Sequence, residues 1–177
     1  MVRIRREVRL VSLGVEHASN MYRWMCDAEV SQNLGLRTPP SLERTRAWIE
    51  HALQDVSVCP FAVLVGDQHV GNVILDRLDD YLASARLSIY IGEPSMRQSG
   101  VGTTALYHAL TEGFERRSLH KIWLTVHARN FRAIATYSRL GFVLEGLLRD
   151  EFWLDGQRLP VLYMGVLRDE FKRIVIE

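Results

Sequence analysis

The sequence is poor in the residues that hold small secreted folds together. It has two cysteines, Cys26 and Cys59, far apart in the chain and without the spacing of metal ligands. Cysteines in this pattern are usually free thiols that pack as small apolar side chains. We therefore expect no disulfide framework and no metal site.

The chain also lacks a long apolar segment and an excess of one charge. No stretch approaches the roughly 20 apolar residues of a membrane-spanning helix, and the basic residues 1–6 are not followed by the apolar run of a signal peptide. Lys and Arg number 22 against 21 Asp and Glu, so the net charge is +1. This balance gives no electrostatic reason to expect nucleic acid or an anionic membrane as the main partner. We expect a cytoplasmic protein.

What the chain does contain is enough apolar material for one core. Of its 177 residues 47% are hydrophobic and 24% charged, without repeats or a Gly/Ser linker. A chain of this length buries most of its apolar surface without covalent staples. We therefore expect a single domain over residues 1–177.

The spacing of apolar residues predicts the order of strands and helices. Ser41 is expected to cap a helix that carries Trp48, Ile49 and Leu53 on one face, and Gly141 to end the last helix. Residues 76–82 and 155–156 are expected to be connections. Strands are expected at 8–13, 61–65, 70–75, 85–91, 121–126, 142–148 and 159–167, and helices at 16–28, from 41 onward, at 103–117 and at 133–140. This order predicts an α/β (α+β) domain with one mixed sheet and helices on both faces.

The most informative segment is Arg97-Gln98-Ser99-Gly100-Val101-Gly102-Thr103, between a strand and a helix. Glycines at this spacing let the backbone approach a ligand and direct several N–H groups one way. The helix adds its positive N-terminal end, and Arg97 could add a charged donor. The segment predicts a phosphate-binding turn; a helix start without a ligand is the alternative.

Two common phosphate-binding motifs fit less well. A Walker loop needs Lys before Ser or Thr, and Gly102 occupies that position. The run from Gly100 to Ala105 matches G-x-G-x-x-A, but a dinucleotide site needs an acidic residue about 20 positions later. Residues 123–126 read Trp-Leu-Thr-Val instead.

The segment resembles the Q/R-x-x-G-x-G/A signature of the GNAT superfamily, the acetyl-CoA-dependent N-acetyltransferases. The resemblance extends over nearly the whole chain, through the element order and through Asn130, Ala133, Tyr137 and Gly141-Phe142. The segment at residues 145–149 with Asp155-Gly156 is similar to the branch of ribosomal-protein N-terminal, spermidine and amino-sugar acetyltransferases. The resemblance implies a mostly antiparallel sheet with a central splay, and acetyl-CoA as co-substrate.

It also implies roles for particular residues. The strand at 89–91 should lend backbone groups to the pantetheine arm, with the N–H of Ile91 as an oxyanion donor. Tyr137 would face the cofactor sulfur as an acid or a hydrogen-bond donor, and Asn130 would bind the cofactor or a water. The residues expected to bind the cofactor are Ile89, Tyr90, Ile91, Arg97, Gln98, Ser99, Gly100, Val101, Gly102, Thr103 and Asn130.

A general base is harder to find. Many members of this branch carry an Ala-Glu pair where this chain has Ala85-Arg86. Without a base, a lysine-like amine with a pKa near 10.4 costs about 4.6 kcal/mol to deprotonate at pH 7, whereas an α-amine with a pKa near 8 costs about 1.4 kcal/mol. The chain thus favours an α-amine or amino sugar over a polyamine. The candidates for the base are His127, which has a suitable titration range, and Asp76, Asp79, Asp80 and Glu29.

Other interpretations remain open at this stage. His127 could be structural, the acidic cluster could be a solvated turn, and Arg86 could lie on the surface or bind an anionic acceptor. A CoA-binding module without turnover and a spermidine acetyltransferase are alternative functions. A homodimer through the sheet edge near the C-terminus is also possible.

Overall fold

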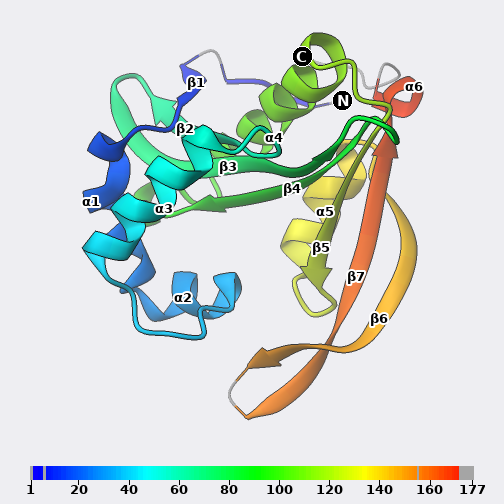
Figure 1. The fold of residues 1–177 in the computed structure, drawn as a ribbon. Coiled ribbons are helices and arrows are strands. Elements are labelled where there is room, and N and C mark those ends of the chain that lie inside the picture. Colours follow the sequence, from blue (N-terminus) through cyan, green and yellow to red (C-terminus); the bar gives the residue numbers. More distant parts are fainter. Residues whose placement is uncertain (1, 6, 155, 172–177) are drawn as a thin grey trace.

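A seven-stranded sheet runs through the molecule in the order β1-β2-β3-β4-β5-β7-β6 (Figure 1). The computed structural model describes residues 2–5, 7–154 and 156–171. The strands are β1 Val8–Ser12, β2 Cys59–Val65, β3 Gln68–Asp79, β4 Ser84–Ile91, β5 Lys121–His127, β6 Val143–Leu154 and β7 Gln157–Leu167. All neighbouring pairs are antiparallel except β4 and β5. The expected mixed, mostly antiparallel sheet is confirmed.

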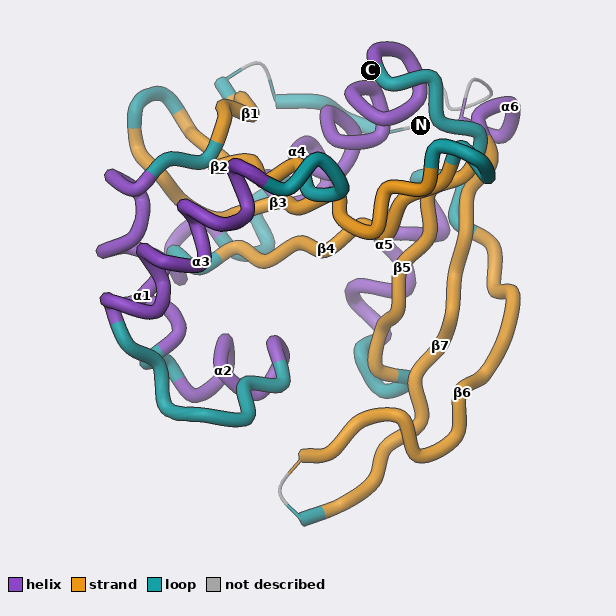
Figure 2. Tube along the Cα trace, in the orientation of Figure 1, coloured by secondary structure: helices purple, strands orange, loops and turns teal. Residues whose placement is uncertain are grey.

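The parallel pair β4–β5 opens partway along its length. The two strands pair only where Ser84–Arg86 faces Lys121–Trp123. Beyond that point β4 continues beside β3 while β5 continues beside β7, and the two halves of the sheet diverge (Figure 2). The edge of β4 from residue 87 to residue 91 is therefore left without a neighbouring strand, as the expected splay requires.

Helices cover both faces of this sheet. On one face α1 and α3 pack on β2 around Leu13, Met21 and Ile49, and on the other the buried side chains of α4 join the main core (Figure 1). The α-helices are α1 Ala18–Met25, α2 Ala28–Leu34, α3 Leu42–Gln54, α4 Val101–Thr111, α5 Phe131–Arg139 and α6 Arg168–Phe171. Short 3-10 turns lie at Val15–His17 and Pro94–Met96, and a π turn at Glu112–Arg116 follows α4.

The first predicted helix is wrong as a single element. Residues 16–28 divide into a 3-10 turn, α1 and the start of α2. Asp27 has an extended backbone, and its carboxylate accepts a hydrogen bond from the N–H of Glu29 at 2.8 Å. An aspartate in this conformation starts a new helix instead of continuing the old one. After this break, α2 lies beside the open end of β4, where Val30 is buried.

Other differences are smaller. Strand β3 continues through residues 76–79, expected as a connection, because Asp76 still pairs with β4. Ser41 caps α3 as expected, but only Ile49 of the predicted apolar face is fully buried, while Trp48 and Leu53 are 39% and 48% exposed. Asp155 of the expected last turn lies outside the described residues, and Gly156 has a positive φ of 76°.

Within the described ranges, no helix is both long and apolar enough to cross a membrane. The cytoplasmic location remains a prediction.

Candidate active site

The first turn of α4 presents free backbone N–H groups. Gly100 is its N-cap residue, with φ of +87°, and provides no side-chain cap. The first intrahelical bond runs from the N–H of Thr104 to the carbonyl of Gly100 at 3.1 Å, and the N–H groups before it have no partner within the helix. A bound anion would satisfy these donors and the positive helix end together.

This turn opens into a cleft of about 340 Å³. Its walls come from α2, from the splayed end of β4, from the start of α4 and from α5. Figure 1 shows where these four elements lie in the fold. The sequence-predicted residues that line it are Ile89, Tyr90, Ile91, Arg97, Gln98, Gly100, Gly102, Thr103, Asn130 and Tyr137. The structure thus gathers residues from four elements that are distant in the sequence.

Two of the expected cofactor residues lie elsewhere. The side chain of Val101 is fully buried in the main core, so only its backbone could serve a ligand. The hydroxyl of Ser99 donates to the carbonyl of Met96 at 2.7 Å, and Ser99 does not line the cleft.

Arg97 is held by the protein itself, whereas the sequence suggested a donor for phosphate. Its guanidinium donates to the carbonyls of Ile91 and Gly92, both at 3.1 Å, and to the carboxylate of Glu29 at 2.6 Å. These three bonds tie the end of β4 to the phosphate-binding turn and to α2. Arg97 therefore holds the walls of the cleft together through these hydrogen bonds.

The same contact fixes the orientation of Ile91. Its carbonyl points to Arg97 and not to β3, and a strand residue directs its N–H and C=O to the same edge. The N–H of Ile91 therefore faces the open side of β4, toward the splay.

Tyr137 lies on α5 and turns a half-buried phenol into the cleft. Its ring packs against Phe142 with the centroids 5.7 Å apart. Burial raises the pKa of Tyr137 to about 12. The phenol stays protonated at neutral pH and is a much weaker acid than a thiol, whose pKa is near 8.5. It can donate a hydrogen bond but is poorly suited to give up its proton.

Asn130 combines the two roles considered for it. Its Oδ1 accepts from the N–H of Ala133 at 3.2 Å, so it is the N-cap of α5. It also lines the cleft. Because the cap uses only the oxygen, the amide nitrogen is left for a ligand or a water.

His127 ends β5 and lies beside the main cleft. It lines a neighbouring pocket of about 390 Å³ that shares Glu29 and Asn130 with the cleft. Its ring packs on Phe152 at 3.8 Å between centroids, and burial lowers its pKa. The imidazole is therefore neutral at pH 7 and can accept a proton.

Three of the four other base candidates have hydrogen-bond partners. The guanidinium of Arg86 on β4 donates two hydrogen bonds to the carboxylate of Asp76 on the neighbouring strand β3, at 2.7 and 2.5 Å. Arg86 therefore forms an ion pair within the protein. Asp79 accepts from the N–H of Leu82 at 2.8 Å, and Glu29 is bound by Arg97. Asp80 is exposed in the turn after β3.

Sequence reasoning missed Arg5. Its side chain donates to the carbonyl of Ser99 at 2.6 Å, and its N–H donates to the hydroxyl of Thr104 at 3.1 Å. It thereby contacts the turn at Ser99 and Thr104, whereas Arg97 links the start of the turn to β4 and α2. An arginine near the chain start carries no local signal for such a contact.

A family model described as an acetyltransferase (GNAT) domain matches residues 7–143. The chain therefore belongs to the GNAT acetyltransferases.

Two curated relatives and one solved structure are similar to this chain. The spermidine N(1)-acetyltransferase of Escherichia coli is 30% identical over 119 residues, which are 67% of this chain and 63% of that protein, so the match spans less than two thirds of its length. A putative ribosomal N-acetyltransferase of Bacillus subtilis is 23% identical over 93% of this chain and 87% of its own. The Vibrio cholerae spermidine N-acetyltransferase, solved with CoA and spermine, superimposes with a TM-score of 0.89 at 24% identity, covering 96% of this chain and 100% of that one.

The site has the donor set that acetyl-CoA needs. The helix start at Gly100 suits the pyrophosphate, and the open edge of β4 suits the amide-bearing pantetheine arm, which can pair with it as a strand would. Among the described residues no group of three or more His, Cys, Asp or Glu side chains could hold a metal ion; independence of metal remains a prediction.

Proposed function

We propose that this protein transfers the acetyl group of acetyl-CoA directly to a primary amine. The observation that carries the proposal is the cleft itself. It joins the uncapped helix start at Gly100, the open edge of β4 and the phenol of Tyr137 in one continuous space.

Each part of the cleft has a task in this reaction. Acetyl-CoA supplies a thioester, whose carbonyl carbon the amine attacks. The N–H of Ile91 is directed to stabilise negative charge on the carbonyl oxygen. Tyr137 donates a hydrogen bond to the leaving sulfur, and its raised pKa keeps that donor in place across the working pH range. Asn130 and the turn at residues 100–103 hold the cofactor.

We assign His127 as the proton acceptor for the amine, directly or through a water. It is neutral at pH 7 because burial lowers its pKa, and it adjoins the cleft. A weak base of this kind suits an amine with a pKa near 8 better than one with a pKa near 10.4. The acceptor is therefore an α-amine or an amino sugar in preference to a lysine-like amine.

Spermidine is the second candidate acceptor, because curated relatives are named for it. Release of CoA thiol is the decisive assay, with purified protein, acetyl-CoA and a panel of spermidine, glucosamine and short peptides with free α-amines. Acetyl transfer predicts thiol release that depends on the acceptor. Tight binding of CoA without such release for any amine would make the protein a binding module and end the enzymatic proposal.

We also propose that the protein forms a homodimer through β6. On this edge strand Val143, Leu144 and Leu147 are each 55–56% exposed to solvent. Exposed apolar strands at a sheet edge are common sites of association. The Vibrio cholerae relative has been solved as a dodecamer. Light scattering should give twice the monomer mass, and Leu147→Lys should reduce it to the monomer. A wild-type monomer at micromolar concentration would contradict the proposal.

A further inference from the structure

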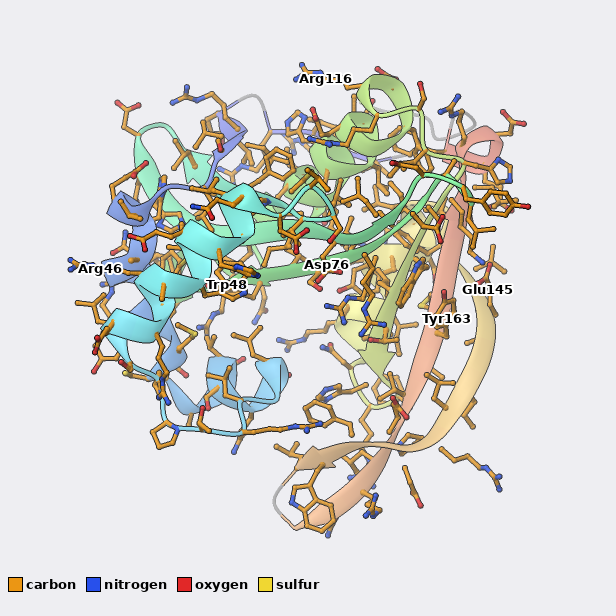
Figure 3. All side chains as sticks on the ribbon, in the orientation of Figure 1. Arg46, Trp48, Asp76, Arg116, Glu145 and Tyr163 are labelled. Carbon is orange, nitrogen blue, oxygen red and sulfur yellow. The ribbon has the colours of Figure 1, made fainter. Side chains whose placement is uncertain are left out.

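A second pocket of about 450 Å³ adjoins the cofactor cleft on the face of the sheet that carries α1 and α3. Met21 and Met25 of α1, Leu34 of α2 and Ile74 of β3 are among its lining residues. Trp48 of α3, which Figure 3 labels, completes the apolar wall.

The two cavities meet at β4 and α2. Tyr90 lines both of them, and α2 provides Val30 to the cleft and Leu34 to the pocket. An acceptor amine that reaches the splay therefore has this pocket beside it. We call it the apolar pocket.

The apolar pocket has no charge that would attract a cation. All of its lining residues are described, and none of them is Asp or Glu. The one charged residue is Arg44, whose guanidinium is turned to the carbonyl of Pro39. A polyamine placed here would lose its hydration without an anionic partner and would also meet a positive charge.

The hydroxyl groups of the pocket are largely engaged within the protein. Thr45 donates to the carbonyl of Ser41 at 2.9 Å, and the Ser41 hydroxyl accepts from the N–H of Arg44 at 3.4 Å. The Tyr90 hydroxyl accepts from the side-chain amide of Asn72 at 2.6 Å. These bonds use the donor of Thr45 and one acceptor site each on Ser41 and Tyr90, so fewer hydroxyl sites are left for a sugar.

Apolar surface is left open instead. Leu34 and Leu36 are each 37% exposed and Trp48 is 39% exposed, and all three line this pocket. Its volume lies in the range of small-molecule sites, and its wall of Met and Trp suits a bulky hydrocarbon group.

We infer that the apolar pocket binds the large apolar side chain of the residue whose α-amine is acetylated. This inference rests on the proposed acetyl transfer and names the class of its acceptor: a peptide or protein N-terminus whose first residue is large and apolar. Burying such a side chain strengthens binding by about 10- to 100-fold over glycine.

The test compares tripeptide amides that begin with leucine and with glycine, together with spermidine. We expect kcat/KM for the leucine peptide to exceed that for the glycine peptide by about 10- to 100-fold and to exceed that for spermidine. Trp48→Ala should lower the leucine value by about tenfold and the glycine value much less. Leu53→Ala, an exposed apolar residue of the same helix outside the pocket, is the matched control and should change neither.

Binding of both peptides to the CoA-loaded protein, measured by calorimetry, tests the pocket independently of turnover. The inference is supported if the leucine peptide binds more tightly than the glycine peptide and Trp48→Ala removes that difference. This holds even if no thiol is released, because the absence of thiol release would contradict only the enzymatic proposal. Equal binding and equal rates for the two peptides, or a preference for spermidine, would overturn the inference and leave acetyl transfer standing. Thermal unfolding of each variant confirms that it is folded.

Discussion

Replacing Tyr137 by Phe removes one hydroxyl and keeps the ring that packs on Phe142. Because burial raises the pKa of Tyr137 to about 12, full proton transfer to a thiolate of pKa near 8.5 would be uphill by about 5 kcal/mol. The phenol therefore acts as a hydrogen-bond donor to the leaving sulfur. A hydrogen bond to a charged group contributes about 1.5–3 kcal/mol, which predicts a fall in kcat of roughly 10- to 150-fold.

The assay is CoA thiol release at saturating acetyl-CoA, with calorimetry for cofactor affinity. We expect the affinity to stay within about twofold, because the lost bond forms only as the thiolate develops. Tyr107→Phe is the control, since Tyr107 packs on Phe171 away from the cleft. The pKa also predicts that the wild-type rate does not fall between pH 8 and pH 10 through ionisation of this phenol. Full activity of Tyr137→Phe, or a basic-limb decline below pH 10 that this variant abolishes, would refute the reasoning.

Three further predictions concern the rest of the cleft. Gly100→Val should abolish acetyl-CoA binding in calorimetry, because a branched residue cannot hold φ of +87°. Gly66→Val, at a positive-φ turn away from the cleft, is the control and should still bind acetyl-CoA. Retained binding by Gly100→Val would show that the pyrophosphate does not bind at this turn. Arg97→Ala should lower kcat by about tenfold and weaken cofactor affinity less, because Arg97 hydrogen-bonds to the carbonyl of Ile91 and fixes its orientation. A larger loss of cofactor affinity in calorimetry than of kcat would instead show that Arg97 is a phosphate ligand. His127→Ala should lower kcat/KM for α-amines by about 100-fold at pH 7. The wild-type rate should fall as the pH drops through the lowered pKa of His127, below about 6.5, because the imidazole then becomes charged; an unchanged acid limb in the variant would exclude it as the base.

The sequence was most informative where a local pattern has one physical solution. The two glycines predicted a turn that directs several N–H groups one way at the start of a helix, and α4 does start there, with Gly100 as an N-cap that has no side-chain cap. The predicted positions of Tyr137 and Asn130 on and before α5 place both in the cleft.

The sequence was least informative about charged side chains that can reach several different hydrogen-bond partners. Arg97 was expected to meet phosphate, yet two backbone carbonyls and Glu29 hold it, because a side chain that long reaches whichever acceptors the fold brings near. The pairing of Asp76 with Arg86 depends on the register of β3 and β4, which is interrupted between residues 76 and 79. Such long-range contacts have no local signature. The apolar pocket was missed for the same reason, since its walls come from five separate elements.

The turn before α4 has an arrangement that is unfavourable for an isolated helix. A helix whose first N–H groups lack a side-chain cap is less favourable in isolation than a capped one. Here that uncapped end lines the cleft beside the splayed β4, Arg5 binds the Ser99 carbonyl of the turn, and Arg97 binds the Ile91 carbonyl at the end of β4. The protein's own side chains thus support the backbone arrangement that a phosphate needs.

The most direct test of this account is a crystal structure of the protein with bound CoA. We predict pyrophosphate oxygens within hydrogen-bonding distance of the backbone N–H groups of residues 100–103, the pantetheine arm along the open edge of β4, and Arg97 still bound to Ile91. Pyrophosphate held elsewhere, with the helix start at Gly100 in contact with solvent alone, would contradict it.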